Sequence, residues 1–380
     1  MRYITADRIF DGTQFLEDGS ALGLDDTGKI VEITTIKKLQ IPYEKYEGIL
    51  MPGFINAHCH LELSHMLGLI PKHTGLIDFA KNIITKRNSA TPDQMQQAMK
   101  VADDFMKQAG IVAVGDISNN NGSFGIKRSS SIYYHTFIEL IGLDPARKNE
   151  ILRTGETLLH ELEKDHLSGS VAPHAPYSTS VDLIAEISKY NTSKQLPLSI
   201  HNQENSEEDA FMQGKPSKFK DLYDFLKMDI SWFKPSFKNS IQAYIHHLKG
   251  NKNILVHNTF TSENDIATSS DAIFWCCCPS ANLYIEGVLP DYELLVKHKK
   301  SVCFGTDSLA SNTDLSIIKE ADLFYQQTND LITTLKGLTS TGAKALGIDE
   351  RFGSFKIGAK PGVNLINTNT KHLSLDQILF

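Results

Sequence analysis

Two histidines one residue apart form the pattern in this sequence that points most directly to chemistry. In His58-Cys59-His60, both imidazoles lie on the same face of a strand and can bind one cation, because successive side chains of a strand alternate between its faces. Farther along the chain, His201 and Glu204 have the spacing His-x-x-Glu. That imidazole can bind a metal while the carboxylate stands beside the metal's water and moves a proton. These residues suggest a metal-dependent hydrolytic site.

Other ionisable residues follow apolar runs of the same kind. His257 follows 254–256, and Asp307 follows 302–306. Imidazoles together with carboxylates suit zinc or ferrous iron better than calcium or magnesium, which prefer oxygen ligands. The run 169–174 contains no lysine that could be carbamylated to bridge two ions. We therefore expect one divalent metal ion, zinc in the first place, with ferrous iron as the alternative.

The elements that must position these groups alternate short β-rich runs with longer amphipathic stretches, which is typical of βα units around a parallel sheet. One predicted helix begins at the capping box of Thr91 and Gln94, has Pro92 in its first turn and ends before Gly110. Eight runs are suited to buried strands, namely 50–60, 111–116, 132–139, 168–174, 196–201, 253–257, 272–278 and 301–307. The sequence thus predicts an α/β fold, a TIM-like (β/α)8 barrel.

Most of these runs end in a polar or ionisable residue. The residues are His60, Asp116, Glu139, His174, His201, His257 and Asp307. In a (β/α)8 barrel the carboxyl ends of all strands meet at one rim. We therefore expect the residues to share one site, although they are far apart in the chain.

The two ends of the chain show turn signals between short β-rich runs, as at Asp11-Gly12 and Thr27-Gly28. We predict that 1–49 and 353–380 together form a small β-sandwich domain and that 50–352 form the metal-dependent hydrolase barrel. A polar and aromatic insertion at about 205–240 follows the fifth strand. It is either a lid over the site or a helical hairpin that packs its own aromatic residues.

The composition excludes several classes of protein. Hydrophobic residues are 41% and charged residues 22% of the chain, as in globular proteins. The net charge of −7 gives no basic field for nucleic acid or acidic lipid. Arg2, Asp7 and Arg8 are unlike a signal peptide, and the apolar runs are shorter than the ~18 residues of a membrane helix. We expect a cytoplasmic protein with reduced cysteines, a small-molecule partner and possible homodimerisation.

Five motifs in this order resemble the amidohydrolase superfamily, and within it the cytosine/guanine deaminase and chlorohydrolase branch. They are 52–62 (PGFINAHCHLE), His201 with Glu204, His257, 278–283 (CPSANL) and 305–308 (GTDS). The stretches 61–64 (LELS) and 282–286 (NLYIE) are most similar to aminodeoxyfutalosine deaminases. The resemblance covers nearly the whole chain and implies the same barrel and small β domain.

The resemblance also implies roles for individual residues. The metal ligands would be His58, His60, His201 and Asp307. Glu204 would be the proton shuttle and His257 would orient the hydrolytic water. Asp307 would also stabilise the tetrahedral adduct that forms when this water adds to the substrate. Glu62, His174 and Asn282 would contact the substrate. For Glu62 and His174 the alternative is a purely structural role, as an exposed glutamate and a core histidine.

The implied reaction is the deamination of an aminopurine or adenine-nucleoside-like heterocycle at its C–NH2 group. A metal-bound hydroxide would attack the ring carbon and ammonia would leave. The same machinery could instead expel chloride or open a cyclic amide. A barrel that has lost its activity and serves in assembly is a further alternative.

Overall fold

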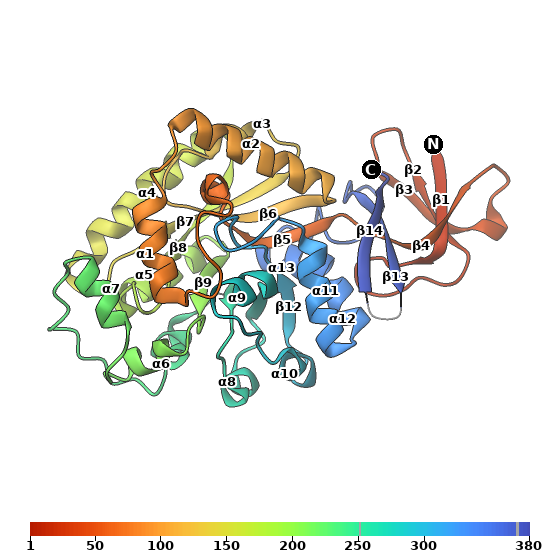
Figure 1. Ribbon diagram of the computed structural model, residues 1–380. Coiled ribbons are helices and arrows are strands. Elements are labelled where there is room, and N and C mark those ends of the chain that lie inside the picture. The colour runs from red at the N-terminus through yellow and green to blue at the C-terminus, as the bar shows by residue number, and fades with distance from the viewer. Residues whose placement is uncertain (251, 370–371) are drawn as a thin grey trace.

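The computed structural model describes residues 1–250, 252–369 and 372–380. Figure 1 shows a barrel of strands and helices, with a smaller sheet at one side on which both chain termini lie. The site predicted above belongs to the barrel.

Parallel strands form the barrel in two hydrogen-bonded sets of four. The first set contains β5 (Phe54–Cys59), β6 (Ile111–Ser118), β7 (Tyr133–Leu140) and β8 (Ser168–Pro173) in that spatial order. The second contains β9 (Leu198–Asn202), β10 (Asn253–His257), β11 (Ile273–Cys277) and β12 (Ser301–Phe304). All eight correspond to strands predicted from the sequence.

The two sets of strands meet through residues of the predicted site. At one seam Cys59 and Asp307 form a parallel bridge, and the Asp307 N–H donates to the carbonyl of His58 at 3.1 Å. At the other seam the His201 N–H donates to the carbonyl of His174 at 2.9 Å. The predicted α/β barrel is therefore confirmed, and the predicted site lies where its halves join.

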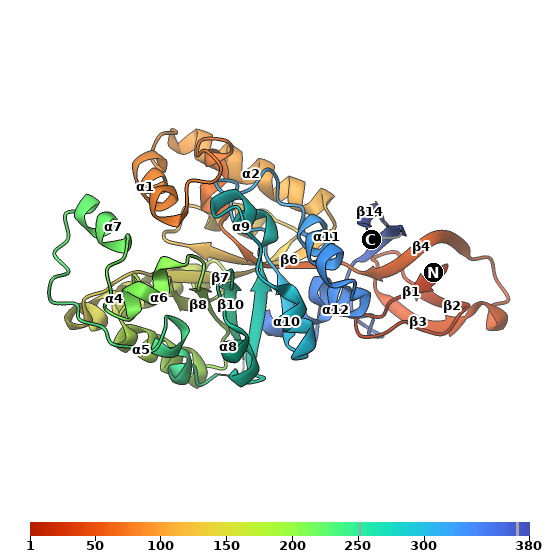
Figure 2. The same ribbon diagram turned by 60° about the horizontal axis from the view of Figure 1, so that its bottom comes forward.

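At least one helix follows each barrel strand (Figures 1 and 2). In chain order they are α1 (Leu76–Lys86), α2 (Pro92–Gln108), α3 (Phe124–Ser129), α4 (Lys148–Lys164), α5 (Val181–Ser193), α6 (Glu207–Met212), α7 (Phe219–Phe225), α8 (Glu263–Thr268), α9 (Pro279–Ile285), α10 (Tyr292–Lys297), α11 (Ile317–Thr328), α12 (Leu331–Lys336) and α13 (Gly342–Leu346). The capping box predicted at Thr91 and Gln94 is present at the start of α2. Within the described ranges, none of these helices combines the length and the apolar character that crossing a bilayer requires.

The small sheet draws strands from both chain ends. It consists of β1 (Arg2–Ile9), β2 (Ser20–Leu24), β3 (Ile30–Thr35), β4 (Glu44–Pro52), β13 (Val363–Asn369) and β14 (His372–Ile378). These strands form one continuous sheet in the order β14-β13-β4-β1-β2-β3, in place of the two separate sheets that a sandwich implies. Ile4, Leu22, Leu50 and Val363 are fully buried in a core that belongs to this sheet.

The sequence predicts one strand over 50–60, but the structure divides this run between the small sheet and the barrel. β4 ends at Pro52 and β5 begins at Phe54. A Cβ on the intervening Gly53 would lie 2.3 Å from Cγ1 of Val112 and 2.8 Å from the carbonyl oxygen of Pro361. Glycine is required there because the two parts of the molecule approach so closely. The apolar pattern of the sequence does not reveal this break, because the residues before and after Gly53 are all buried.

The insertion after β9 contains the short helices α6 and α7. Its residues Phe211, Phe219 and Tyr223 are buried, and the rings of Phe211 and Phe219 are 5.3 Å apart between centroids. These aromatic residues share a cluster with Leu76 and Phe79 of α1. The insertion thus packs its own aromatic residues, as one of the two alternatives predicted, and does so against α1.

Candidate active site

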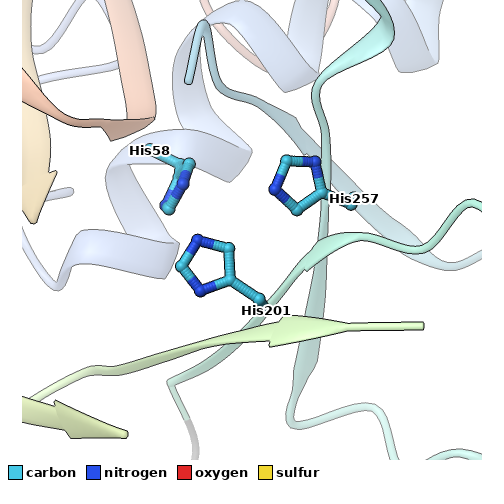
Figure 3. A group of neighbouring side chains, drawn as sticks. All are labelled: His58, His201 and His257. Carbon is cyan, nitrogen blue, oxygen red and sulfur yellow. The ribbon is translucent and has the colours of Figure 1, made fainter. Parts of the chain in front are cut away.

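Imidazoles from three strands meet at the carboxyl end of the barrel. His58 lies on β5, His201 on β9 and His257 at the end of β10, and Figure 3 shows their rings around a common space. One nitrogen of each ring lies within 4.8 Å of the others. The ring centroid of His58 is 5.0 Å from that of His201 and 5.9 Å from that of His257. All three residues are buried. Burial lowers the pKa of His201 and of His257, which disfavours the protonated forms of these two imidazoles.

A second group joins the same space and shares His58. The Nε2 atoms of His58 and His60 are 3.1 Å apart, and Oδ1 of Asp307 lies 3.5 Å and 3.3 Å from them. Burial raises the pKa of Asp307, but the surrounding imidazoles outweigh this effect and hold that pKa well below its ordinary value. The two facing ring nitrogens and the buried carboxylate oxygen are donors of the kind that suit a divalent metal ion.

The ring of His201, the third predicted histidine ligand, is oriented by a hydrogen bond from its Nδ1 atom. His201 donates from Nδ1 to the carbonyl oxygen of His174 at 2.8 Å. That bond directs Nε2 toward the imidazole cluster, as is usual for histidines that bind metals. Together with the two groups above, the geometry brings all four predicted ligands into one place, and the residues present fit a metal ion.

The backbone is strained at this rim. Gln203, His257 and Asp307 have φ angles of 42°, 72° and 56°, in the left-handed region that side chains other than glycine rarely adopt. Such strain persists where surrounding contacts enforce it and is frequent at functional sites. At Asp307 those contacts include the Ser311 hydroxyl, which donates to the carboxylate.

Glu204 lies beside the imidazoles and faces His257. Its Oε1 is 3.7 Å from Nε2 of His257, and its backbone N–H donates to the carboxylate of Glu208 at 2.7 Å. Burial raises the pKa of Glu204 well above its ordinary value and raises that of Glu208 to about 7. Burial also lowers the pKa of His257 to about 4. A buried carboxyl group and a neutral imidazole therefore stand side by side.

These groups form the floor of a pocket of about 340 Å³. His60, His174, His201, Glu204, His257 and Asp307 all line it. Its outer walls are apolar and come mainly from Leu76, Phe79 and Ile83 of α1 and from Leu222 and Tyr223 of α7. The pocket can hold a molecule with a polar reacting end and an apolar remainder.

The three predicted substrate contacts fall in different places. His174 lines the pocket, and its Nδ1 is 2.6 Å from the Ser178 hydroxyl. Glu62 is not among the lining residues and accepts hydrogen bonds from the Asn119 N–H and from Nδ2 of Asn120. Asn282 is buried, does not line the pocket, and accepts a hydrogen bond from Nδ1 of His257 at 3.0 Å.

Glu139 belongs to the site, as its position at a strand end predicted, although the sequence assigned it no role. Its Oε1 lies 3.8 Å from Nδ1 of His201, and its Oε2 accepts a hydrogen bond from Asn119. It lines the pocket and forms a cluster of possible ligands with His174 and His201.

Asp116, another strand end, was also expected to share the site, and this expectation is wrong, because Asp116 does not line the pocket. It forms a fully buried ion pair with Lys127 at 2.6 Å and accepts a hydrogen bond from the Leu61 N–H at 2.7 Å. Asp116 thus fixes the backbone directly after His60.

The five cysteines are free and buried, in agreement with the expected reduced state.

A ring of imidazoles and carboxylates at the carboxyl rim of an α/β barrel defines a class of metal-dependent hydrolases. The model of the Amidohydrolase family matches residues 49–378, and the chain belongs to this family. It is therefore a hydrolase of that class, as the sequence motifs predicted.

Similar proteins include named deaminases of nucleoside-like substrates. The chain is 27% identical to an adenosine deaminase of Helicobacter pylori over 92% of this chain and 88% of that protein. It is 25% identical to an aminodeoxyfutalosine deaminase of Nitratiruptor sp., over 100% and 96% of the two chains. The crystal structure of Helicobacter pylori aminofutalosine deaminase in complex with methylthio-coformycin matches with a TM-score of 0.82 and 25% identity, covering 98% of this chain and 93% of that one.

Proposed function

We propose that the protein deaminates the adenine-like base of a nucleoside and releases ammonia. The observation that carries this proposal is the carboxylate of Glu204, which faces His257 at the floor of the pocket, beside the imidazole cluster. Hydrolytic removal of an amino group from a ring needs a group that carries protons at that point. The deaminase relatives support the same reaction and an adenine nucleoside as its substrate.

We assign one metal ion to His58, His60, His201 and Asp307. Two of the three possible ligand groups around this space share His58, and the third is joined to them through His201, which supports a single ion rather than two independent ones. Nitrogen-rich donors favour zinc, with ferrous iron as the alternative. When bound, the ion would polarise water and lower its pKa toward neutrality.

The protein's own groups would then carry the reaction. Oε1 of Glu204 takes a proton from the attacking water and passes it to the ring nitrogen beside the amino group. Nε2 of His257 holds the water in line with the ring carbon, and Asp307 accepts a hydrogen bond from the newly formed hydroxyl group. The proton of this hydroxyl group then passes to the amino nitrogen, the C–N bond breaks as the carbonyl forms, and ammonia leaves.

The remaining polar and apolar residues would select the substrate. His174 and Glu139, which line the pocket, would bind sugar hydroxyls, whereas Glu62 would act through Asn119 and Asn282 through His257. The apolar walls support a nucleoside with an apolar group on its sugar. The methylthio-coformycin bound by the Helicobacter pylori relative is consistent with this expectation.

The proposal is tested by ammonia release from metal-loaded protein. Adenosine, 5′-methylthioadenosine and aminodeoxyfutalosine are compared with a chlorinated triazine, for which released chloride is measured. We expect ammonia from the adenine nucleosides, with the highest kcat/KM for those with a large 5′ group. Chloride release without deamination, or no ammonia from any adenine nucleoside, would contradict the proposal.

A further inference from the structure

One carboxylate oxygen outside the pocket lining connects two separate parts of the site. Oε1 of Glu286, which follows α9, accepts a hydrogen bond from Nδ2 of Asn205 and another from the backbone N–H of Leu76, both at 2.7 Å. Asn205 directly follows Glu204, and Leu76 is the first residue of α1. The same atom therefore contacts the loop of the proton-moving residue and the helix that forms the apolar wall.

The segment before α1 is held against α9 by further hydrogen bonds. The Tyr284 hydroxyl donates to the carbonyl of Ile70 at 2.6 Å, the His73 N–H donates to the carbonyl of Tyr284 at 2.7 Å, and the Gly75 N–H donates to that of Ile285 at 3.0 Å. Figure 1 shows this loop passing beside α9. α9 also contains Asn282, the partner of His257. It is thus a fixed support onto which α1 is docked.

On the other side, Asn205 is 7% exposed, and its amide has few alternatives to Glu286. Its Oδ1 accepts a hydrogen bond from the Glu207 N–H at 2.7 Å, and its own N–H donates to Glu208 at 3.2 Å. Without Glu286, Nδ2 would be left as a buried donor without its acceptor, which is costly and favours a shift of the loop. Glu204 would move with it, because the two residues are adjacent.

We infer that Glu286 is a positioning residue that fixes the Glu204 loop and the apolar wall of the pocket relative to each other. A substrate whose apolar group rests on α1 is thereby held at a set distance from the carboxylate of Glu204. The inference rests on the proposed function, and it makes Glu286 a determinant of which 5′ groups are turned over efficiently.

The test compares Glu286→Ala, Glu286→Gln and Asn205→Ala with a control, Glu293→Gln. Glu293 is an exposed carboxylate on the neighbouring α10 and has no hydrogen-bond partner within the described part of the chain. The kcat and KM values are measured with adenosine, which lacks an apolar 5′ group, and with 5′-methylthioadenosine. Melting temperatures show whether each variant is folded.

We expect Glu286→Ala to lower kcat about tenfold for both substrates, since small displacements of a reacting group are costly. It should raise KM severalfold for 5′-methylthioadenosine only. Asn205→Ala should reproduce the loss of kcat without the change in KM, and the double variant should lose no more kcat than Glu286→Ala. Glu286→Gln, which keeps an acceptor oxygen, should change the same parameters less, and Glu293→Gln should match the wild type.

An equal loss of kcat/KM for both substrates in Glu286→Ala would overturn the inference, because a merely structural defect does not distinguish 5′ groups. An unchanged kcat in Asn205→Ala would overturn it as well. If Glu286→Ala does not fold, Glu286→Gln replaces it in the test. A lower kcat for both substrates with a higher KM for 5′-methylthioadenosine only would then support the inference, and equal changes for both substrates would overturn it.

Failure of the proposed function would be recognised separately, as absence of ammonia release from every adenine nucleoside by the wild type. Hydrogen exchange then decides the role of Glu286. Faster exchange in Glu286→Gln at both 75–80 and 203–208, and at neither in Glu293→Gln, would support the linkage. Faster exchange in one segment alone would refute it.

Discussion

Burial acts in opposite directions on the two residues that face each other in the pocket. It raises the pKa of the Glu204 carboxyl and lowers that of the His257 imidazole to about 4. Each side chain is thereby biased toward its neutral form. A carboxyl group that holds a proton reversibly and an imidazole with a free lone pair are suited to pass protons to and from a water molecule.

We expect Glu204→Gln to lower kcat by about 10²-fold or more, because glutamine has the same shape but cannot transfer a proton. Metal content should stay at the wild-type level, since Glu204 is not among the proposed ligands. Ammonia release and elemental analysis of the same preparation test this. Full turnover by the metal-loaded variant would refute the role of Glu204.

Asn282 is predicted to act through His257 rather than on the substrate. Asn282→Ala removes the acceptor of the His257 Nδ1 proton, so the ring loses its fixed orientation. We expect kcat to fall about 10- to 100-fold, as for other partners of functional histidines, with little change in KM. Steady-state kinetics distinguish the two roles, because a direct substrate contact would instead raise KM.

At the scale of elements, α11 fixes two functional segments through one buried carboxylate. Glu320 accepts hydrogen bonds from the Ser280 N–H of α9 at 2.8 Å and from Nδ2 of Asn312 at 2.9 Å. Asn312 also donates to the carbonyl of Thr306, directly before Asp307. The helix that carries Asn282 and the loop that carries Asp307 are thus held in place by the same side chain.

The same carboxylate should make stability depend on pH. Burial raises the pKa of Glu320 from 4.5 to about 7. The unfolded state therefore ionises first, and stability that is fully present below pH 4.5 is lost as the pH rises through 7.

We expect Glu320→Gln, which resembles the protonated side chain, to lack this loss. Relative to the wild type, its free energy of unfolding should increase by at most about 3 kcal/mol between pH 4.5 and pH 7, so that the variant becomes the more stable protein. Denaturant unfolding across this interval measures the difference. Parallel curves for the two proteins would show that Glu320 is not the cause.

At the scale of the whole molecule, the proposed metal ligands come from both sets of barrel strands. His58 lies on β5 of the first set and His60 directly after it, whereas His201 lies on β9 of the second set and Asp307 follows β12 of that set. Because the sets meet through these residues, a bound ion would tie the halves of the barrel together as well as activate water.

We therefore expect a chelator to lower the melting temperature by roughly 10 °C, since a ligand bound far above its Kd contributes about 4 kcal/mol to stability. Activity should disappear at the same time, and zinc or ferrous iron should restore both. Calorimetry of metal-loaded and chelated protein measures this. An unchanged melting temperature after the metal is shown to be removed would contradict it.

The sequence alone determined the barrel, the β strands at both chain ends, helix 92–108 and the types of residue at the strand ends. These features depend on local periodicity, capping and spacing, which a single chain displays directly. The convergence of His58, His201, His257 and Asp307 was also predictable, because the topology of a parallel barrel brings strand ends to one rim.

Only the tertiary structure decided which side chains touch across long stretches of sequence. Glu286 links Leu76 with Asn205, and the strand run breaks at Gly53 where Val112 and Pro361 approach. Each depends on distances between elements far apart in the chain, for which local patterns carry no information. The chemistry could thus be read from residue types and spacing, whereas the partners that position it follow from packing.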